Sequence, residues 1–212
     1  MKKLPRSFYS RDSVTVARDL LGKLLVRVHD SIPLVGRITE TEAYVGPVDK
    51  ACHAYGYRKT RRNATMFGPP GHAYIYLIYG MYACLNFVTN EEGEPDAVLL
   101  RGLEPVYGKD TLCHLRYGKP WDELTAYQRK NFLNGPGKCC KALALDTSLD
   151  RTDLTGDDLF ICSSLADVGL ADVPLSPFTV SAGKRIGIDY AEEAVDFPWR
   201  FTLVPQKGGS LC

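Results

Sequence analysis

The sequence predicts a protein of the α+β class. Strand patterns outnumber helical patterns, the helices are irregularly spaced, and no alternating βαβ rhythm runs along the chain. The 212 residues, of which 45% are hydrophobic, are enough for one well-packed domain and leave little room for a second. We therefore expect a single compact domain over residues 1–212, without internal repeats or a low-complexity linker.

The N-terminal third predicts one helix followed by two strands. An apolar stripe at helical spacing ends near Leu21, and Ser10 or Asp12 can cap the start of that helix. Strand patterns then cover residues 23–30 and 34–44.

The rest of the chain begins with a long loop over residues 45–72. The further strand patterns cover residues 73–78, 82–89, 97–105, 184–188 and 200–204. Helical patterns cover residues 125–133 and 139–146, and "NGPGK" at 134–138 predicts a turn between them.

A hairpin is predicted where "YIYLIYGMY" places four tyrosines in nine uncharged residues. Strand alternation puts Tyr76 and Tyr79 on opposite faces. Gly80 follows Tyr79 directly and favours a tight turn, so Tyr79 lies at or next to the hairpin tip. A tip aromatic can enter a base stack, or it can lie flat on its own protein.

The charge is unevenly distributed along the chain, although the net charge is only +1. Residues 50–90 contain no carboxylate and five Lys or Arg, four of them in "RKTRR" at 58–62. The pattern predicts one positive face, and its plain alternative is a solvated basic loop. Because the same segment holds the tyrosines and "FGPPGH", its composition favours a surface that grips phosphates and stacks on bases.

Two carboxylates in "ETEAYVGPVDKACH", those of Glu40 and Glu42, lie on one face of a predicted strand. Such a pair can act as acid and base on a glycosidic bond, and it can equally be a solvated strand face. Ile38 precedes the pair on that face and Tyr44 follows it, so we expect one carboxylate to be less solvated than the other.

Neither metal sites nor disulfides are indicated by the sequence. The seven cysteines include no CxxC pair, and the four histidines have no metal-ligand spacing, so we expect reduced, mostly buried thiols and no metal. No apolar run reaches the roughly 18 residues that span a bilayer, and no apolar region follows the first lysines. We expect a soluble, unexported protein that does not bind membranes.

Several long blocks resemble one family of enzymes. The blocks "GRITETEAYVGPVDKACH", "RRNATMFGPPGHAYIYLIYGMYACLN", "LLRGLEP" and "NGPGK" are similar, in order and spacing, to the alkyladenine (3-methyladenine) DNA glycosylases. The resemblance implies a compact domain with a mostly antiparallel, curved β-sheet flanked by helices and a protruding hairpin. It also implies excision of alkylated or deaminated purines, such as 3-methyladenine and hypoxanthine, from double-stranded DNA by a monomer without a cofactor.

The resemblance assigns the reacting residues. Glu42 is then the general base that deprotonates a water for attack on the sugar C1′, leaving an abasic site. Tyr44, His53 and Tyr76 form an aromatic pocket around the flipped base, whose electron-rich faces favour a cationic alkylpurine. Asn86 matches a pocket asparagine that clashes with the 2-amino group of guanine.

The resemblance also assigns DNA contacts. Tyr79 is the residue that fills the gap left by the flipped nucleotide, and Arg101 lies beside that nucleotide. Arg58 and Lys138 contact the DNA backbone, while Glu40 has no chemical role and is structural. No lysine nucleophile appears in the matched motifs, which implies a monofunctional enzyme without lyase activity. Such an enzyme is expected in the nucleoid-containing cytoplasm of a bacterium, or in the nucleus of a eukaryote.

Two other classes of function remain open. A catalytically silent nucleic-acid-binding module would keep the basic face and the hairpin but would not need Glu42. A hydrolase or transferase for a small sugar or nucleoside would use Glu40 and Glu42, and its binding would be indifferent to salt.

Overall fold

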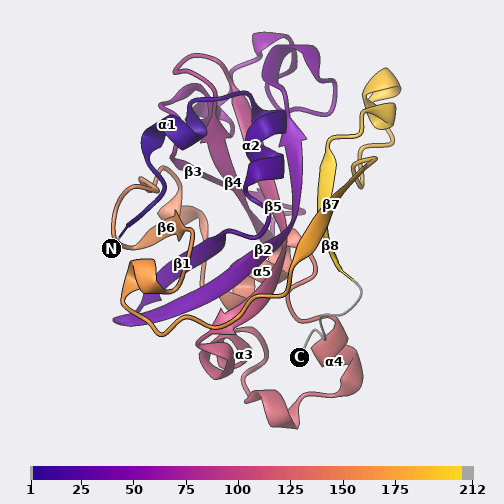
Figure 1. Cartoon of the computed structure of the whole chain (residues 1–212). Helices are drawn as coiled ribbons and strands as arrows, with labels where there is room; N and C mark the ends of the chain where they lie inside the picture. The colour runs from indigo at the N-terminus through magenta and orange to yellow at the C-terminus, as the bar shows by residue number, and fades with distance from the viewer. Residues whose placement is uncertain (1, 207–212) are drawn as a thin grey trace.

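An antiparallel sheet of eight strands organises the chain (Figure 1). The computed structural model describes residues 2–206. The strand order is β3-β4-β5-β2-β1-β6, and β8 pairs with both β2 and β7. The strands are β1 (Leu24–His29), β2 (Ile32–Tyr44), β3 (Ala73–Ile78), β4 (Tyr82–Thr89), β5 (Asp96–Tyr107), β6 (Leu159–Cys162), β7 (Phe178–Gly183) and β8 (Arg200–Pro205). The predicted α+β class and antiparallel sheet are confirmed.

Strand β2 gives the sheet its curvature. It pairs with β5 along one side, and along the other side it pairs first with β1 and then with β8. Its register against β5 shifts on both sides of Glu40, and such bulges bend a strand. Gly102 lies opposite Glu40, where a Cβ atom would stand 2.9 Å from Thr39 Oγ1 and 3.2 Å from Glu40 Cβ. The bend therefore needs a glycine, and it lies two residues before Glu42.

Short helices cover the sheet. They are α1 (Arg6–Tyr9), α2 (Ser13–Asp19), α3 (Lys109–Tyr117), α4 (Ala126–Lys130) and α5 (Pro136–Ala142). As predicted, Asp12 caps α2, because its side chain accepts a hydrogen bond from the Thr15 amide over 2.8 Å. Single turns of 3-10 helix are η1 (Gly46–Val48), η2 (Tyr55–Tyr57), η3 (Ala64–Phe67), η4 (Trp121–Glu123), η5 (Thr147–Leu149), η6 (Ala166–Val168) and η7 (Glu192–Asp196).

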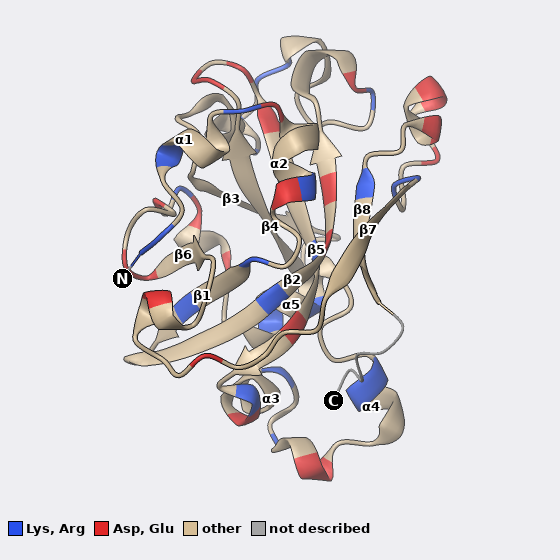
Figure 2. Cartoon of the chain, in the orientation of Figure 1, with Lys and Arg blue, Asp and Glu red and all other residues tan. Residues whose placement is uncertain are grey.

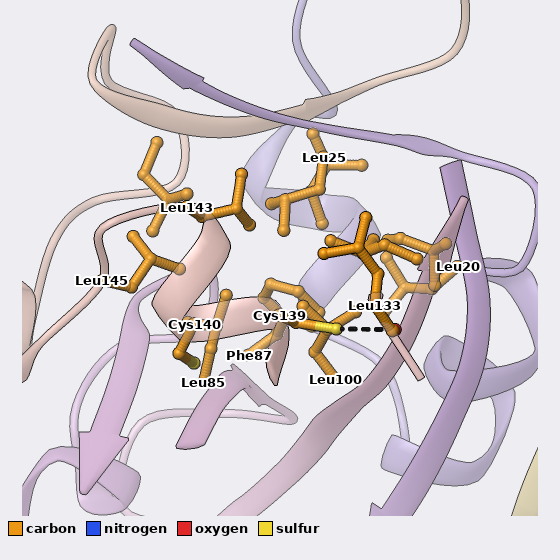
Figure 3. Close-up of a cluster of buried hydrophobic side chains, with 14 of the residues drawn as sticks. Leu20, Leu25, Leu85, Phe87, Leu100, Leu133, Cys139, Cys140, Leu143 and Leu145 are labelled. Carbon is orange, nitrogen blue, oxygen red and sulfur yellow. Dashed lines mark hydrogen bonds between the residues drawn. The ribbon is translucent and has the colours of Figure 1, made fainter. Parts of the chain in front are cut away.

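The main core lies where α2 and α5 pack on the sheet (Figure 3). Leu20, Phe87 and Leu100 point toward one another there and are almost fully buried. The thiol of Cys139 donates to the Leu133 carbonyl over 3.1 Å, so its polar atom is satisfied inside this apolar cluster. The six cysteines of the described chain are free and buried, as expected, and Cys212 lies outside the described residues.

One predicted strand is wrong. Residues 184–188 form no strand, and the strand of this region, β7, ends at Gly183. The alternating apolar residues imitate a strand, but Arg185 is turned inward onto Asp49 and Gly187 has a φ of +74°. The chain therefore leaves the sheet here and crosses toward the end of β2, where Ile186 donates to Glu42.

The predicted turn at residues 134–138 is also partly wrong, because α5 already begins at Pro136. Proline suits the first position of a helix, where its missing N–H has no intrahelical partner. No sequence pattern predicted α1, α3, β6 or β7.

Charged side chains are spread over the fold rather than gathered on one element (Figure 2). The acidic turn η7 and the basic end of α4 stand at opposite ends of the molecule. No helix within residues 2–206 combines the length and the apolar character that crossing a bilayer requires.

Candidate active site

A cavity of about 290 Å³ lies between the β3–β4 hairpin, strand β5 and the segment that follows β7. Its volume is near the lower limit of ligand pockets and suits a small aromatic group. Six of the side chains singled out from the sequence line it: Tyr44, His53, Tyr76, Tyr79, Asn86 and Arg101.

Glu42 lies directly behind the wall of this cavity and is fully buried. Its Oε2 accepts hydrogen bonds from the Tyr44 hydroxyl over 2.9 Å and from Arg101 Nη1 over 3.2 Å. Its Oε1 accepts the backbone N–H of Ile186 over 2.8 Å. All three donors belong to residues that line the cavity. Burial raises the pKa of Glu42, and Arg101, Ile186 and Tyr44 oppose that rise by favouring the carboxylate. A carboxyl with a raised pKa next to a cavity is suited to take up a proton.

Glu40 has a different environment, although it is only two residues away. Its side chain is 18% exposed, and its Oε1 accepts hydrogen bonds from Arg101 Nε over 3.1 Å and Arg200 Nε over 2.6 Å. The prediction that one carboxylate is less solvated than the other is confirmed. Glu40 ties β5 and β8 to β2, which is a structural role.

Aromatic rings form one side of the cavity. The rings of His53 and Tyr76 meet edge to face with centroids 4.7 Å apart, and Nδ1 of His53 lies 3.0 Å from the Tyr74 hydroxyl. Partial desolvation of the imidazole by the surrounding protein, aided by the nearby Arg62, lowers the pKa of His53 to about 4. The imidazole is therefore neutral at neutral pH, and a cationic ring in the cavity would meet no positive charge from it.

Asn86 lies on the cavity wall in β4 and is 4% exposed. Its Nδ2 donates to the backbone carbonyls of Tyr74 over 3.1 Å and Cys84 over 3.4 Å. Since both bonds use the amide nitrogen, the side-chain orientation is fixed and the amide oxygen remains as an acceptor.

The tip of the β3–β4 hairpin carries Tyr79, as predicted. Tyr79 and Gly80 have φ values of +53° and +70°, and the Met81 amide donates back to the Ile78 carbonyl over 3.2 Å. Two successive positive φ values are typical of the tight turns that join antiparallel strands. Tyr79 is 83% exposed, so its ring does not lie flat on its own protein.

The family model of methylpurine-DNA glycosylase (MPG) matches residues 7–207. The chain belongs to this family. A relative from Clostridium perfringens (strain 13 / Type A) is 46% identical over 207 residues, with 97% of each chain covered. A relative from Clostridium novyi (strain NT) is 46% identical with 98% of each covered, and one from Alkaliphilus oremlandii (strain OhILAs) is 47% identical with 95% of each covered.

All three relatives carry the provisional name 3-methyladenine DNA glycosylase. The resemblance seen in the sequence is therefore confirmed. The expected class of enzyme, a DNA glycosylase that acts as a hydrolase in base-excision repair, is confirmed with it. The individual roles of the site residues remain predictions.

Two residues that the family resemblance assigns to the DNA backbone lie outside the cavity. Arg58 is exposed in the loop after η2, and its backbone carbonyl is held by Asn63 Nδ2 over 2.8 Å. Lys138 lies at the start of α5, where its Nζ donates to Oδ1 of Asn131 and of Asn134 over 3.1 and 2.8 Å. It lines a second cavity, which it shares with Arg101.

The predicted positive face is supported only for part of the acid-free segment. Arg58, Lys59, Arg61 and Arg62 are all exposed. Lys50 instead pairs with Glu192 and Glu193 of η7 over 2.5 and 2.9 Å, so its charge is compensated.

Sequence reasoning missed three contributors to this methylpurine-DNA glycosylase site. Ile186 acts through its backbone N–H, which no side-chain pattern reveals. Arg62 lies with its guanidinium 4.9 Å from the Tyr76 ring centroid, and Tyr190 stands 69% exposed beside the cavity. The glycine of "RIGI" could have indicated that the chain turns here and not that it forms a strand. Gly187 has a positive φ, and the turn brings this segment to the cavity.

The described residues contain no group of three or more His, Cys, Asp or Glu side chains arranged to hold a metal ion.

Proposed function

We propose that this protein excises alkylated and deaminated purines, such as 3-methyladenine and hypoxanthine, from double-stranded DNA. Glu42 activates a water that hydrolyses the N-glycosidic bond and leaves an abasic site. The observation that carries the proposal is the buried Glu42 carboxylate, hydrogen-bonded to Tyr44, Arg101 and Ile186 at the wall of an aromatic cavity. The names of the relatives, which mention 3-methyladenine, support the alkylated purines among these substrates.

The raised pKa of Glu42 suits a general base. A carboxylate there takes a proton from water, and its negative charge stabilises the positive charge that develops on the sugar as the base departs. Arg101 Nη1 lies 3.2 Å from Glu42 Oε2 and favours the ionised form of Glu42, which opposes the effect of burial on its pKa.

Selection of damaged bases follows from the cavity walls. Where a ring face of Tyr44, His53 or Tyr76 meets a cationic alkylpurine, the attraction is about 0.5–2 kcal/mol per contact. A neutral His53 preserves that attraction. Asn86 is fixed by its two hydrogen bonds and can exclude the 2-amino group of guanine by a steric clash.

Base flipping is assigned to the hairpin. Tyr79 stands at the tip beside the cavity mouth, where a ring can fill the space that an extruded nucleotide leaves in the duplex. Arg58 and Lys138 contact DNA phosphates, and binding therefore weakens as salt rises.

The cavity favours hydrolysis over lyase chemistry. No lysine is among the residues from the described chain that line it. A lyase needs an amine nucleophile that attacks the sugar, whereas the group proposed to act here is the carboxylate of Glu42. We propose a monofunctional monomer that works on nucleoid DNA in the bacterial cytoplasm.

The test is a single-turnover assay on duplexes that carry one 3-methyladenine, hypoxanthine or ethenoadenine. Abasic product, revealed by alkali, is expected from at least one lesion, while undamaged duplex and the free nucleosides stay intact. Abasic product from none of the lesions would refute the proposal. Cleavage of free nucleosides that is insensitive to salt would instead favour a small-molecule hydrolase.

A further inference from the structure

We propose that the buried pair of Arg185 and Asp49 is a positioning device that holds the Ile186 amide and the Tyr44 ring against Glu42. This inference rests on the proposed function of Glu42. It assigns a role to two residues that touch neither Glu42 nor the cavity surface directly.

The pair ties separate parts of the chain together. Both side chains are 0% exposed. Arg185 Nη1 donates to Asp49 Oδ2 over 2.5 Å and to the Ala43 carbonyl over 2.8 Å. Nη2 donates to Asp49 Oδ1 over 2.8 Å and to the Ala194 carbonyl over 3.2 Å. The guanidinium thus joins the end of β2, the loop of η1 and the turn η7.

Asp49 is fixed as firmly as its partner. Its Oδ2 accepts the Val45 amide over 3.3 Å, and its Oδ1 accepts the Ala51 amide over 3.0 Å. A carboxylate that accepts four hydrogen bonds is held in place, so the arginine fork meets a rigid acceptor.

The position of the pair connects it to Glu42 by two routes. Arg185 directly precedes Ile186, whose N–H donates to Glu42 Oε1. The guanidinium carbon also lies over the Tyr44 ring, 4.8 Å from its centre, and 5.1 Å from the centre of the Trp199 ring, so it makes cation–π contacts with both. Tyr44 donates to the other oxygen of Glu42. Two of the three donors that hold the carboxylate are therefore fixed by one side chain.

Stability alone does not account for this arrangement. Removing two charges from water offsets most of their attraction, and well-packed apolar residues are often at least as stabilising. What apolar residues cannot supply is a directional fork that holds three backbone segments in one register.

The charged groups around Glu42 give the device a measurable readout. Glu40 and Tyr44 face it from β2, Arg101 faces it from β5, Arg200 of β8 is bonded to Glu40, and Arg185 lies behind Tyr44. The hydrogen bonds from Ile186 and Tyr44 both lower the pKa of Glu42. Loss of the positioning pair should therefore raise that pKa, and the base should become ionised only at higher pH.

The test compares Asp49→Asn with Asp196→Asn in the full chain. The control makes the same chemical change in the exposed ion pair of the neighbouring Lys184, whose side chain and partner are 66% and 75% exposed. The readout is the single-turnover excision rate at saturating enzyme, measured against pH. Asp49→Asn should slow excision roughly 10- to 100-fold, the range for a displacement of about 1 Å. Its half-maximal pH should rise by about one unit, the equivalent of one hydrogen bond to a charged group. Asp196→Asn should match the unmodified protein in both.

A second variant guards against misfolding. The double variant Arg185→Met/Asp49→Asn leaves no buried charge unpaired, and it should fold while showing the same slow rate and the same pH shift. Arg185→Lys keeps the positive charge but not the two-pronged guanidinium. Its excision rate and half-maximal pH should lie between those of the unmodified protein and those of the double variant. Affinity for a duplex with a stable abasic-site analogue should be unchanged in all of them.

Unchanged rate and pH profile in both Asp49→Asn and the double variant would overturn the inference. A slower rate with an unshifted pH profile would also overturn it, because that result indicates general loosening of the fold. If the unmodified protein excises no lesion, the proposed function fails instead, and the two failures are thereby distinguished.

Discussion

The hydroxyl of Tyr44 donates a hydrogen bond to Oε2 of Glu42 over 2.9 Å. One residue thus contributes its ring to the cavity wall and its hydroxyl to the buried carboxylate. The two roles can be separated by removing the oxygen atom alone.

Tyr44→Phe should shift the pH dependence of excision. The hydroxyl lowers the pKa of Glu42, so its loss raises that pKa further above the ordinary value. Since the base acts in its ionised form, the half-maximal pH of the single-turnover rate should move upward. At pH values below the half-maximal pH, where the rate follows the ionised fraction of Glu42, the rate should fall by roughly 3- to 10-fold, as expected for one hydrogen bond of about 1 kcal/mol. A downward shift, or an unchanged profile, would contradict the role of this contact.

His53 should remain neutral across the working range of the enzyme. Partial desolvation of the ring, with Arg62 nearby, lowers its pKa to about 4. In a heteronuclear NMR titration, its ring resonances should move with a midpoint near pH 4 and stay constant above about pH 6. The resonances can be assigned by their disappearance in His53→Gln. A midpoint at or above the ordinary value of about 6.5 would show that the cavity carries a positive charge near neutrality.

Tyr79→Ser should weaken capture of the flipped nucleotide without changing the chemistry at Glu42. Stacking of one aromatic ring on a base contributes about 1–3 kcal/mol, so excision at limiting enzyme should slow by roughly 5- to 150-fold. The pH profile should not move. Tyr127→Ser is a matched control, because Tyr127 is also exposed and lies on α4 away from the cavity. Equal effects of the two substitutions would argue against a wedge at the hairpin tip.

Glu42→Gln should make the protein more stable at alkaline pH. Burial raises the pKa of Glu42 in the folded state above its ordinary value of 4.5, so folding favours the protonated form. The contribution of Glu42 to the free energy of unfolding is therefore complete below pH 4.5, and it is lost as pH rises through the pKa of Glu42 in the folded protein. The uncharged glutamine avoids this loss, and the Tm at pH 8 should rise by about 2–4 °C for each kcal/mol regained.

The gain in Tm should shrink as pH falls toward 4. Glu40→Gln is the control, since Glu40 accepts bonds from two arginines and its removal should lower Tm. A lower Tm for Glu42→Gln at pH 8 would mean that its three donors outweigh its burial.

Local patterns were sufficient to predict the hairpin. The alternation of residues 73–78 and the glycine after Tyr79 predicted a turn, and the structure has that turn with Tyr79 at its tip. The unequal solvation of Glu40 and Glu42 was likewise predicted from Ile38 and Tyr44 on the same strand face.

Contacts between distant segments were not predictable in this way. Asp49 and Arg185 are 136 positions apart, and nothing in either neighbourhood indicates an ion pair. The apolar alternation around Arg185 predicted a strand, but burying its guanidinium against Asp49 turned the segment away from the sheet. The bond from Ile186 to Glu42 depends on that turn, and because its donor is a backbone group it leaves no trace in the sequence.

The role of Glu42 came from family resemblance rather than from its own pattern, so it needs a direct test. The measurement is lesion excision and lesion binding by Glu42→Gln beside the unmodified protein, on one duplex and at one salt concentration. We predict that the variant binds the lesion duplex with nearly unchanged affinity, while its single-turnover excision rate falls by roughly 100-fold or more, as for loss of a general base. Excision at the unmodified rate by a folded Glu42→Gln protein would contradict the assignment of Glu42 as the base.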